Sequence, residues 1–86
     1  MTVHIPSTLR SYTKQKRALE AEGYTVAEML SGLDRHYPGL RFRIVTAQDT
    51  IRPHIRFFFN DRQISTLAGT VTRDDRVYII CTLSGG

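Results

Sequence analysis

The sequence predicts an α+β fold in which one main helix packs on one face of a mixed sheet of four or five strands. An amphipathic helix pattern fills residues 24–39, and alternating apolar residues mark strands near both ends of the chain. With 86 residues and 41% apolar composition, the chain has the size and content of a single domain. The predicted element order is β-β-α-β-(short β)-β.

Two extended segments precede the helix. "TVHIP" alternates, with Val3 and Ile5 on one face, and Pro6 limits the strand because proline cannot donate a ladder hydrogen bond. "RSYTKQK" has no hydrophobic period and predicts a polar connection. "RALEAEG" predicts the second strand of a hairpin, although its alanines and glutamates suit a helix equally well by propensity.

The helix pattern begins at a capping box, in which Thr25 and Glu28 each satisfy the other's free backbone N–H. Tyr24 and Met29 occupy the positions of a hydrophobic staple. A Pro-Gly pair at 38–39 ends the helix. One apolar stripe runs along it, formed by Val26, Met29, Leu30, Leu33 and Tyr37.

The second half of the chain predicts two further clear strands, "HIRFFFN" and "RVYIICTL". Between them, "NDRQI" predicts a turn, and "LAGTVTRDD" predicts a loop that closes with a turn at Asp74-Asp75. The segment 40–53 stays open among a short strand, a helical turn and an irregular loop. The first and last strands are expected to lie side by side in the middle of the sheet.

The charge and the composition limit the classes of partner and the compartment that we expect. The net charge is +4, but the basic residues are spread along the chain without a block of five, which favours a solvated surface or an acidic protein partner over nucleic acid. The chain shows neither a membrane-spanning apolar run nor a basic start followed by an apolar core. The single cysteine, Cys81, excludes a disulfide framework and favours the cytoplasm.

The residues do not predict an enzyme. His4, His36 and His54 lack metal-ligand spacing, and Cys81 lies in an apolar strand, where a thiol is expected to be inert. The glycines before the C-terminus stand alone rather than forming a phosphate loop. Asp74-Asp75 is interpreted as a turn rather than a pair of catalytic carboxylates.

The two glycines at the end, Gly85 and Gly86, are the strongest functional signal. They remove side chains, allow any backbone conformation and leave the terminal carboxylate unhindered, which suits a tail that enters a narrow channel. An engineered or accidental tail is the alternative explanation. We therefore expect a folded domain over residues 1–82 and a flexible C-terminal tail over residues 83–86.

Four stretches, "VHIPSTLR", "TVAEMLSGLDRHYPGL", "FFFNDRQI" and "RDDRVYIICTLSGG", occur in the order typical of one family. Through them nearly the whole chain resembles the ubiquitin-like sulfur carriers of the thiamin and molybdopterin carrier (ThiS/MoaD) type. It looks closest to the branch that serves cysteine biosynthesis, whose relatives also supply sulfur to secondary metabolites. The resemblance implies a β-grasp fold. Asp74-Asp75 departs from the frequent Gly-Asp, and Cys81 stands where proline is frequent.

The resemblance also implies a mechanism. An E1-like adenylyltransferase would use ATP and Mg²⁺ to adenylate the Gly86 carboxylate, and a sulfur nucleophile would displace AMP to leave a thiocarboxylate. A sulfur-accepting biosynthetic enzyme would then take the sulfur, while Gly85 and Ser84 give access. The carrier itself would bind no cofactor. Some relatives are trimmed by a metallopeptidase before use.

Alternation predicts a docking surface on the sheet. If Phe57 and its alternate neighbours face the helix, then Phe58, Tyr78 and Ile80 face outward as an apolar partner site. A register shifted by one residue would bury Phe58 and expose Phe57 instead. The arginines expected to rim this surface and to steer an acidic partner are Arg56, Arg62 and Arg76.

Two other functions remain open from the residues. The same adenylated Gly86 would also serve a protein modifier that is joined to lysine amines. A non-covalent β-grasp module that binds RNA or protein is the second alternative, although clustered basic and aromatic residues are missing.

Overall fold

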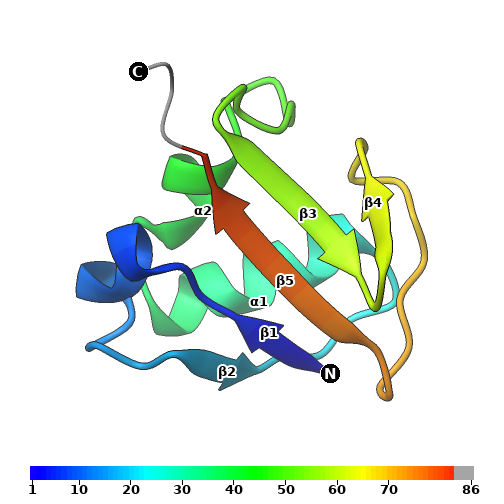
Figure 1. Ribbon diagram of the computed structural model, residues 1–86, viewed down its shortest axis with the longest axis horizontal. Helices are drawn as coiled ribbons and strands as arrows, with labels where there is room; N and C mark the ends of the chain where they lie inside the picture. The colour runs from blue at the N-terminus through cyan, green and yellow to red at the C-terminus, as the bar shows by residue number, and fades with distance from the viewer. Residues whose placement is uncertain (83–86) are drawn as a thin grey trace.

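The structure is a computed structural model that describes residues 1–82, and it contains a five-stranded mixed sheet covered on one face by a helix (Figure 1). The strand order is β2-β1-β5-β3-β4. The first and last strands form the central parallel pair, and all other neighbours are antiparallel. The predicted α+β fold and its central pair are therefore confirmed. The strands are β1 (Thr2–His4), β2 (Ala18–Glu20), β3 (Ile55–Phe59), β4 (Arg62–Ile64) and β5 (Arg76–Cys81).

The core lies between the sheet and helix α1 (Val26–His36). Successive side chains of a strand point to opposite faces, so the apolar positions of β1, β3 and β5 all turn toward α1. Phe57 is the largest side chain that is fully buried, and Val3 and Val77 are equally inaccessible to solvent. The helix contributes Val26, Met29, Leu30 and Leu33 of the predicted stripe, and Tyr37, the last member, is the C-cap residue and is partly buried against the core.

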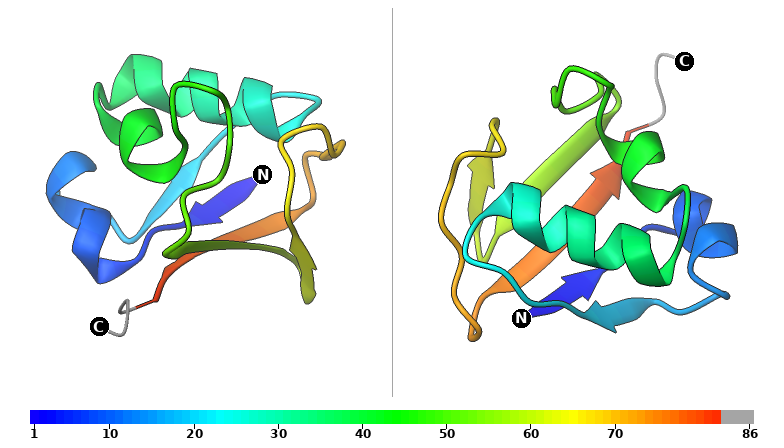
Figure 2. Two further views of the ribbon diagram at one scale, coloured as in Figure 1. Left: turned by 90° about the horizontal axis from the view of Figure 1, so that it is seen from above. Right: turned by 180° about the vertical axis from the view of Figure 1, so that it is seen from behind.

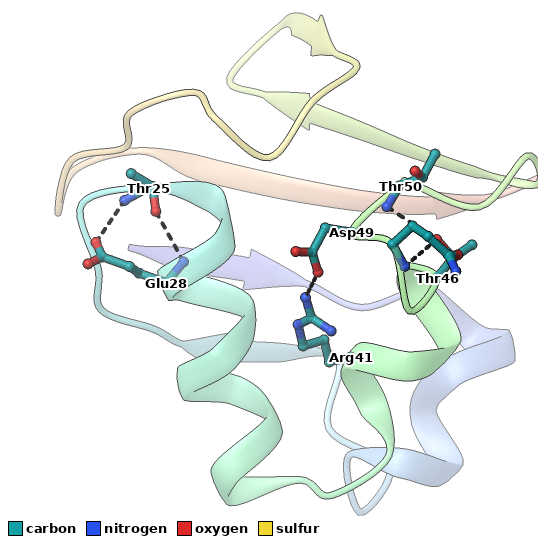
Figure 3. Close-up of polar contacts among 7 residues, drawn as sticks. Thr25, Glu28, Arg41, Thr46, Asp49 and Thr50 are labelled. Carbon is teal, nitrogen blue, oxygen red and sulfur yellow. Dashed lines mark hydrogen bonds and ion pairs between the residues drawn. The ribbon is translucent and has the colours of Figure 1, made fainter.

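The capping box at the start of α1 is present in both halves (Figure 3). The Thr25 hydroxyl accepts from the Glu28 backbone N–H at 3.1 Å, and a Glu28 carboxylate oxygen accepts from the Thr25 N–H at 3.2 Å. The predicted staple is wrong. Tyr24 is 82% exposed while Met29 is fully buried, because the same Glu28 oxygen holds the Tyr24 N–H at 2.8 Å and its ring stays in solvent.

Two short helices form in segments for which the sequence predicted no helix or left the structure open. A 3-10 helix, η1 (Ser7–Tyr12), begins before the predicted polar connection "RSYTKQK" and runs into it, and its Leu9 is buried. The open segment after α1 forms α2 (Leu40–Ile44). Leu40 and Ile44 are four residues apart and both fully buried, so the helical spacing determines the structure and leaves Phe42 61% exposed.

The predicted turn "NDRQI" is partly wrong. Only Asn60 and Asp61 form a turn, with Asn60 in the left-handed region at φ 57°. The remaining residues form the edge strand β4, because they continue the antiparallel ladder with β3 after the chain reverses. The turn before β5 is confirmed, since the Asp75 carboxylate accepts from the Thr72 N–H at 2.8 Å and its own N–H donates to the Thr72 carbonyl.

The parallel pairing of β1 and β5 brings their carboxyl ends to the same end of the molecule. Helices η1 and α2 contact each other at this end, together with the segment 45–54 that leads into β3 (Figure 2). Within residues 1–82, no helix has the length and apolar character that crossing a membrane requires.

Candidate functional site

The diglycine Gly85-Gly86 and the adjoining Ser84 lie outside the residues that the structure describes. The structure does place Thr82, from which the chain continues toward them. The Thr82 N–H donates to the His54 carbonyl at 2.8 Å, and its hydroxyl donates to the same oxygen at 3.2 Å. These two bonds hold the chain at a defined end of the sheet, immediately before the predicted tail.

The strand that leads to Thr82, β5, is the central strand of the sheet. β5 pairs in parallel with β1 over Arg76–Tyr78 and antiparallel with β3 over Val77–Cys81. A central strand has ladder hydrogen bonds on both edges, so its position depends on two neighbours rather than one. The fold therefore fixes the position of Thr82 and the direction of the strand that leads to it.

The outer face of the sheet has the predicted register. Phe58 and Tyr78 are half-buried and Ile80 is 43% exposed, while Phe57 and Ile79 point into the core. The alternative register, which would have exposed Phe57, is excluded by its complete burial. Phe58 and Tyr78 are direct cross-strand partners, so the two aromatic side chains lie together on the face away from α1.

A histidine extends this aromatic pair, and sequence reasoning assigned it no functional role. His4 is the cross-strand partner of Tyr78, and the two rings stack with centroids 4.4 Å apart and planes 6° from parallel. The register continues the row to both edges of the sheet, through Ala18 on one side and Gln63 on the other. The signal was available, because alternation places His4 opposite Val3 and the first and last strands were expected to be neighbours.

The three predicted rim arginines do not gather in one place. Arg56 is the partner of Ile80, and its guanidinium donates to the Pro53 carbonyl at 2.6 Å, near the end of β5. Arg76 begins β5 and therefore lies at the opposite end of the sheet. Arg62 pairs with Phe59, whose side chain points to the core, so the expectation that it rims the outer face is wrong.

The described residues contain nothing that resembles a catalytic centre. No group of three or more His, Cys, Asp and Glu side chains that could hold a metal ion occurs in residues 1–82. The three histidines belong to different places, namely β1, the end of α1 and the turn before β3. Cys81 is half-buried and packs against the core beside Ile55, its cross-strand partner.

Comparison with known proteins settles the family. A model described as the ThiS family matches residues 3–86, which is nearly the entire chain and includes the diglycine. The chain belongs to the ThiS family. This chain is thus a sulfur carrier and not an enzyme, as the resemblance implies.

Individual relatives support the same assignment for this ThiS-family chain. The sulfur carrier protein CysO of Mycobacterium tuberculosis is 28% identical over 91 aligned residues, which cover 100% of this chain and 98% of that protein. A chain from the crystal structure of the Amycolatopsis orientalis BexX/CysO complex has a TM-score of 0.91 at 28% identity, covering 99% of this chain and 98% of that one. The small archaeal modifier protein 1 of Methanosarcina acetivorans, with a TM-score of 0.80 and 22% identity over 99% of this chain and 94% of its own, shares the fold.

Proposed function

We propose that this carrier transports sulfur as a thiocarboxylate on Gly86. The observation that supports the proposal most directly is the double hydrogen bond of Thr82 to the His54 carbonyl, at the end of the central strand. Residues 83–86 follow this point, and four residues in extended form reach roughly 13 Å at about 3.3 Å per residue. That length suffices for the carboxylate to enter a partner's active site while the folded domain docks at its entrance.

The chemistry resides at one carboxylate. In the first step a Gly86 oxygen attacks the α-phosphorus of ATP, and pyrophosphate leaves with Mg²⁺ in the active site of an E1-like adenylyltransferase. The resulting acyl-adenylate is a good electrophile because AMP is a stable leaving group. Sulfide, or a persulfide with a reductant that releases the second sulfur, then attacks the carbonyl carbon and displaces AMP. The product carries one sulfur in place of one oxygen.

The domain contributes positioning rather than proton transfer. We propose that partners dock on the outer face of the sheet, where Phe58, Tyr78 and Ile80 form an apolar surface that His4 extends. Aromatic side chains supply much of the contact energy in protein interfaces. Gly85 and Ser84 would then pass through the channel that leads to the reacting carboxylate.

The acceptor is proposed from the relatives. The similarity to CysO supports a biosynthetic enzyme that forms cysteine or a related sulfur-containing metabolite as the acceptor. The solved complex of CysO with BexX supports direct docking of such carriers on a partner protein. We place the reaction in the cytoplasm, where ATP is supplied and a lone thiol stays reduced. A metallopeptidase is required only if further residues follow Gly86 in the gene product.

The decisive experiment measures the intact mass of the protein after incubation with ATP, Mg²⁺, sulfide and an adenylyltransferase of the cognate type. We expect a gain equal to the exchange of one oxygen for sulfur, and no gain in a variant that lacks Gly86. A variant with Cys81→Ser serves as the control for sulfur bound to the only thiol, and it should gain the same mass. An unchanged wild-type mass without pyrophosphate exchange would contradict the proposal.

The Gly86 deletion also distinguishes the proposed function from the two alternatives. A protein modifier would form adducts with lysine amines, seen as larger species that require Gly86 and resist thiol reagents. A non-covalent module that binds RNA or protein would keep its binding after deletion of Gly86. The similarity to the small archaeal modifier protein 1 does not favour the first alternative, because 22% identity shows a shared fold alone.

A further inference from the structure

The charges of the molecule are separated along β5. The carboxylates Glu20, Glu22, Glu28, Asp61, Asp74 and Asp75 lie at the end where β5 begins, on the β2–α1 connection and on the turns before β4 and β5. Basic residues dominate the end where β5 finishes, among them Lys14, Lys16, Arg17, Arg43, Arg52 and Arg56. Arg62, Arg73 and Arg76 also lie at the acidic end, where the carboxylates outnumber them, so the excess of positive charge lies at the end that carries Thr82.

This basic end carries two contacts between an arginine and an aromatic ring, one on the exposed ring of Phe42 and one on the partly buried ring of Tyr12. The Arg52 guanidinium lies over the Phe42 ring, 4.7 Å from its centroid, and Arg43 lies over the Tyr12 ring at 5.3 Å. Phe42 remains 61% exposed despite its partner. We call Tyr12, Phe42, Arg43 and Arg52 the arginine–aromatic platform.

The Arg52–Phe42 part of the platform is held in place by the backbone of α2. The Arg52 side chain donates through Nε to the Phe42 carbonyl at 2.7 Å, and its backbone N–H donates to the Ile44 carbonyl at 3.0 Å. These bonds fix the guanidinium over the ring before any partner arrives. A preformed arrangement of this kind loses little side-chain entropy on binding.

The two arginines of the platform are also not neutralised by a carboxylate of the described residues. Arg41 forms an ion pair with Asp49 across the turn that follows α2 (Figure 3). It is the only ion pair between side chains within residues 1–82, so Arg43 and Arg52 have no carboxylate partner in that part of the chain. Arginine and exposed aromatic side chains are the residue types enriched where protein partners bind most strongly.

We propose that the platform is a second docking surface, which binds an acidic surface of the activating enzyme that adenylates Gly86. It rests on the proposed function, because it assigns the partner's chemistry beside the same site. The connection is direct in the chain: Arg52 is two residues from His54, whose carbonyl holds Thr82. A partner whose channel begins near Thr82 therefore has its entrance beside the basic end. Carboxylates around that entrance would complement the platform and guide the approach of the tail.

The test compares matched variants at the two ends of the molecule. Phe42→Ala and Arg52→Glu change the platform, while Tyr24→Ala and Arg73→Glu make the same kinds of change at exposed positions of the acidic end. Adenylation by the activating enzyme is followed by pyrophosphate exchange. We expect each platform variant to raise the KM for the carrier about tenfold with kcat unchanged, and the controls to match wild type. Equal KM values for all four variants and wild type would overturn the proposal.

A second measurement tests the platform without relying on adenylation. If the wild-type chain is not adenylated, the proposed function fails, but the platform is still tested by titrating the ¹⁵N-labelled chain with a glutamate-rich peptide. Shifts confined to the backbone of α2 and residues near Arg52, lost in Arg52→Glu, would support the proposal. Shifts spread over the whole basic end, or stronger binding of an oligouridylate, would overturn it in favour of a diffuse charge effect or a nucleic-acid surface.

Discussion

At the scale of single residues, two glycines beside α1 differ in what a side chain would meet. Gly23 has φ +143°, and a Cβ placed on it would lie 2.9 Å from the backbone nitrogen of Met29. Gly32 lies inside the helix, and a Cβ there would meet nothing nearer than the Glu22 carbonyl oxygen at 3.9 Å. The first glycine is therefore required by the fold, and the second is not.

We predict opposite effects of alanine at these two positions. Gly32→Ala should raise the free energy of unfolding by about 0.5–1 kcal/mol, since alanine loses less backbone entropy in a helix. Gly23→Ala should lower it by more than about 1 kcal/mol, because both the backbone angle and the close contact resist a side chain. Urea unfolding followed by circular dichroism measures both. Destabilisation by Gly32→Ala would show that the site has less room than described.

At the scale of elements, the sequence predicted the structure correctly where the apolar residues had only one spacing, that of a strand or that of a helix. It failed where both spacings were present. The alternation in "HIRFFF" and "RVYIIC" has no competing helical pattern, so strands and register were predicted correctly. In "LRFRI", Leu40, Phe42 and Ile44 alternate, yet Leu40 and Ile44 also have helical spacing. Only the surrounding core decides between these periods, and it buries the two residues that are four apart.

A prediction at this scale concerns a charge placed on the outer face of the sheet. Ile80→Glu should raise the KM of the activating enzyme for the carrier about tenfold or more, because a charge would enter an apolar contact. Ile80 is 43% exposed, so the free energy of unfolding should change by less than about 0.5 kcal/mol. Ser31→Glu, which introduces the same charge at an exposed position of α1 on the other side of the sheet, provides the control. Unaltered kinetics in Ile80→Glu would place the partner elsewhere.

At the scale of the whole molecule, the sheet joins residues that the sequence keeps far apart. His4 and Tyr78 stack only because β1 and β5 pair in the register Thr2–Arg76, and no local pattern specifies that register. The same holds for the arginine–aromatic platform, since Tyr12 and Arg43 belong to different helices. Thus strands β1, β2, β3 and β5 were predictable from their own residues, whereas the site assembled from several strands and helices required the fold.

The separation of charge predicts how activation depends on salt. Raising NaCl from about 0.05 M to about 0.5 M should raise the KM for the carrier several-fold, because exposed charges are screened beyond a Debye length of about 10 Å at 0.1 M. The effect should shrink in Arg52→Glu and persist in Arg73→Glu. Steady-state kinetics at several salt concentrations provides the measurement. A KM that does not respond to salt would exclude steering by the basic end.

The central position of β5 also has a consequence for synthesis. While the ribosome is still making the chain, β1–β2 and β3–β4 can form only as two separate hairpins, each with an exposed edge. The strand that joins them is the last one made, and its pairing with β1 closes a loop of most of the chain, which is a slow event in folding. A product that stops before Arg76 therefore cannot fold into the docking-competent shape. Such fragments also lack Gly85 and Gly86, so under the proposed function they would not be folded competitors for the partner enzymes.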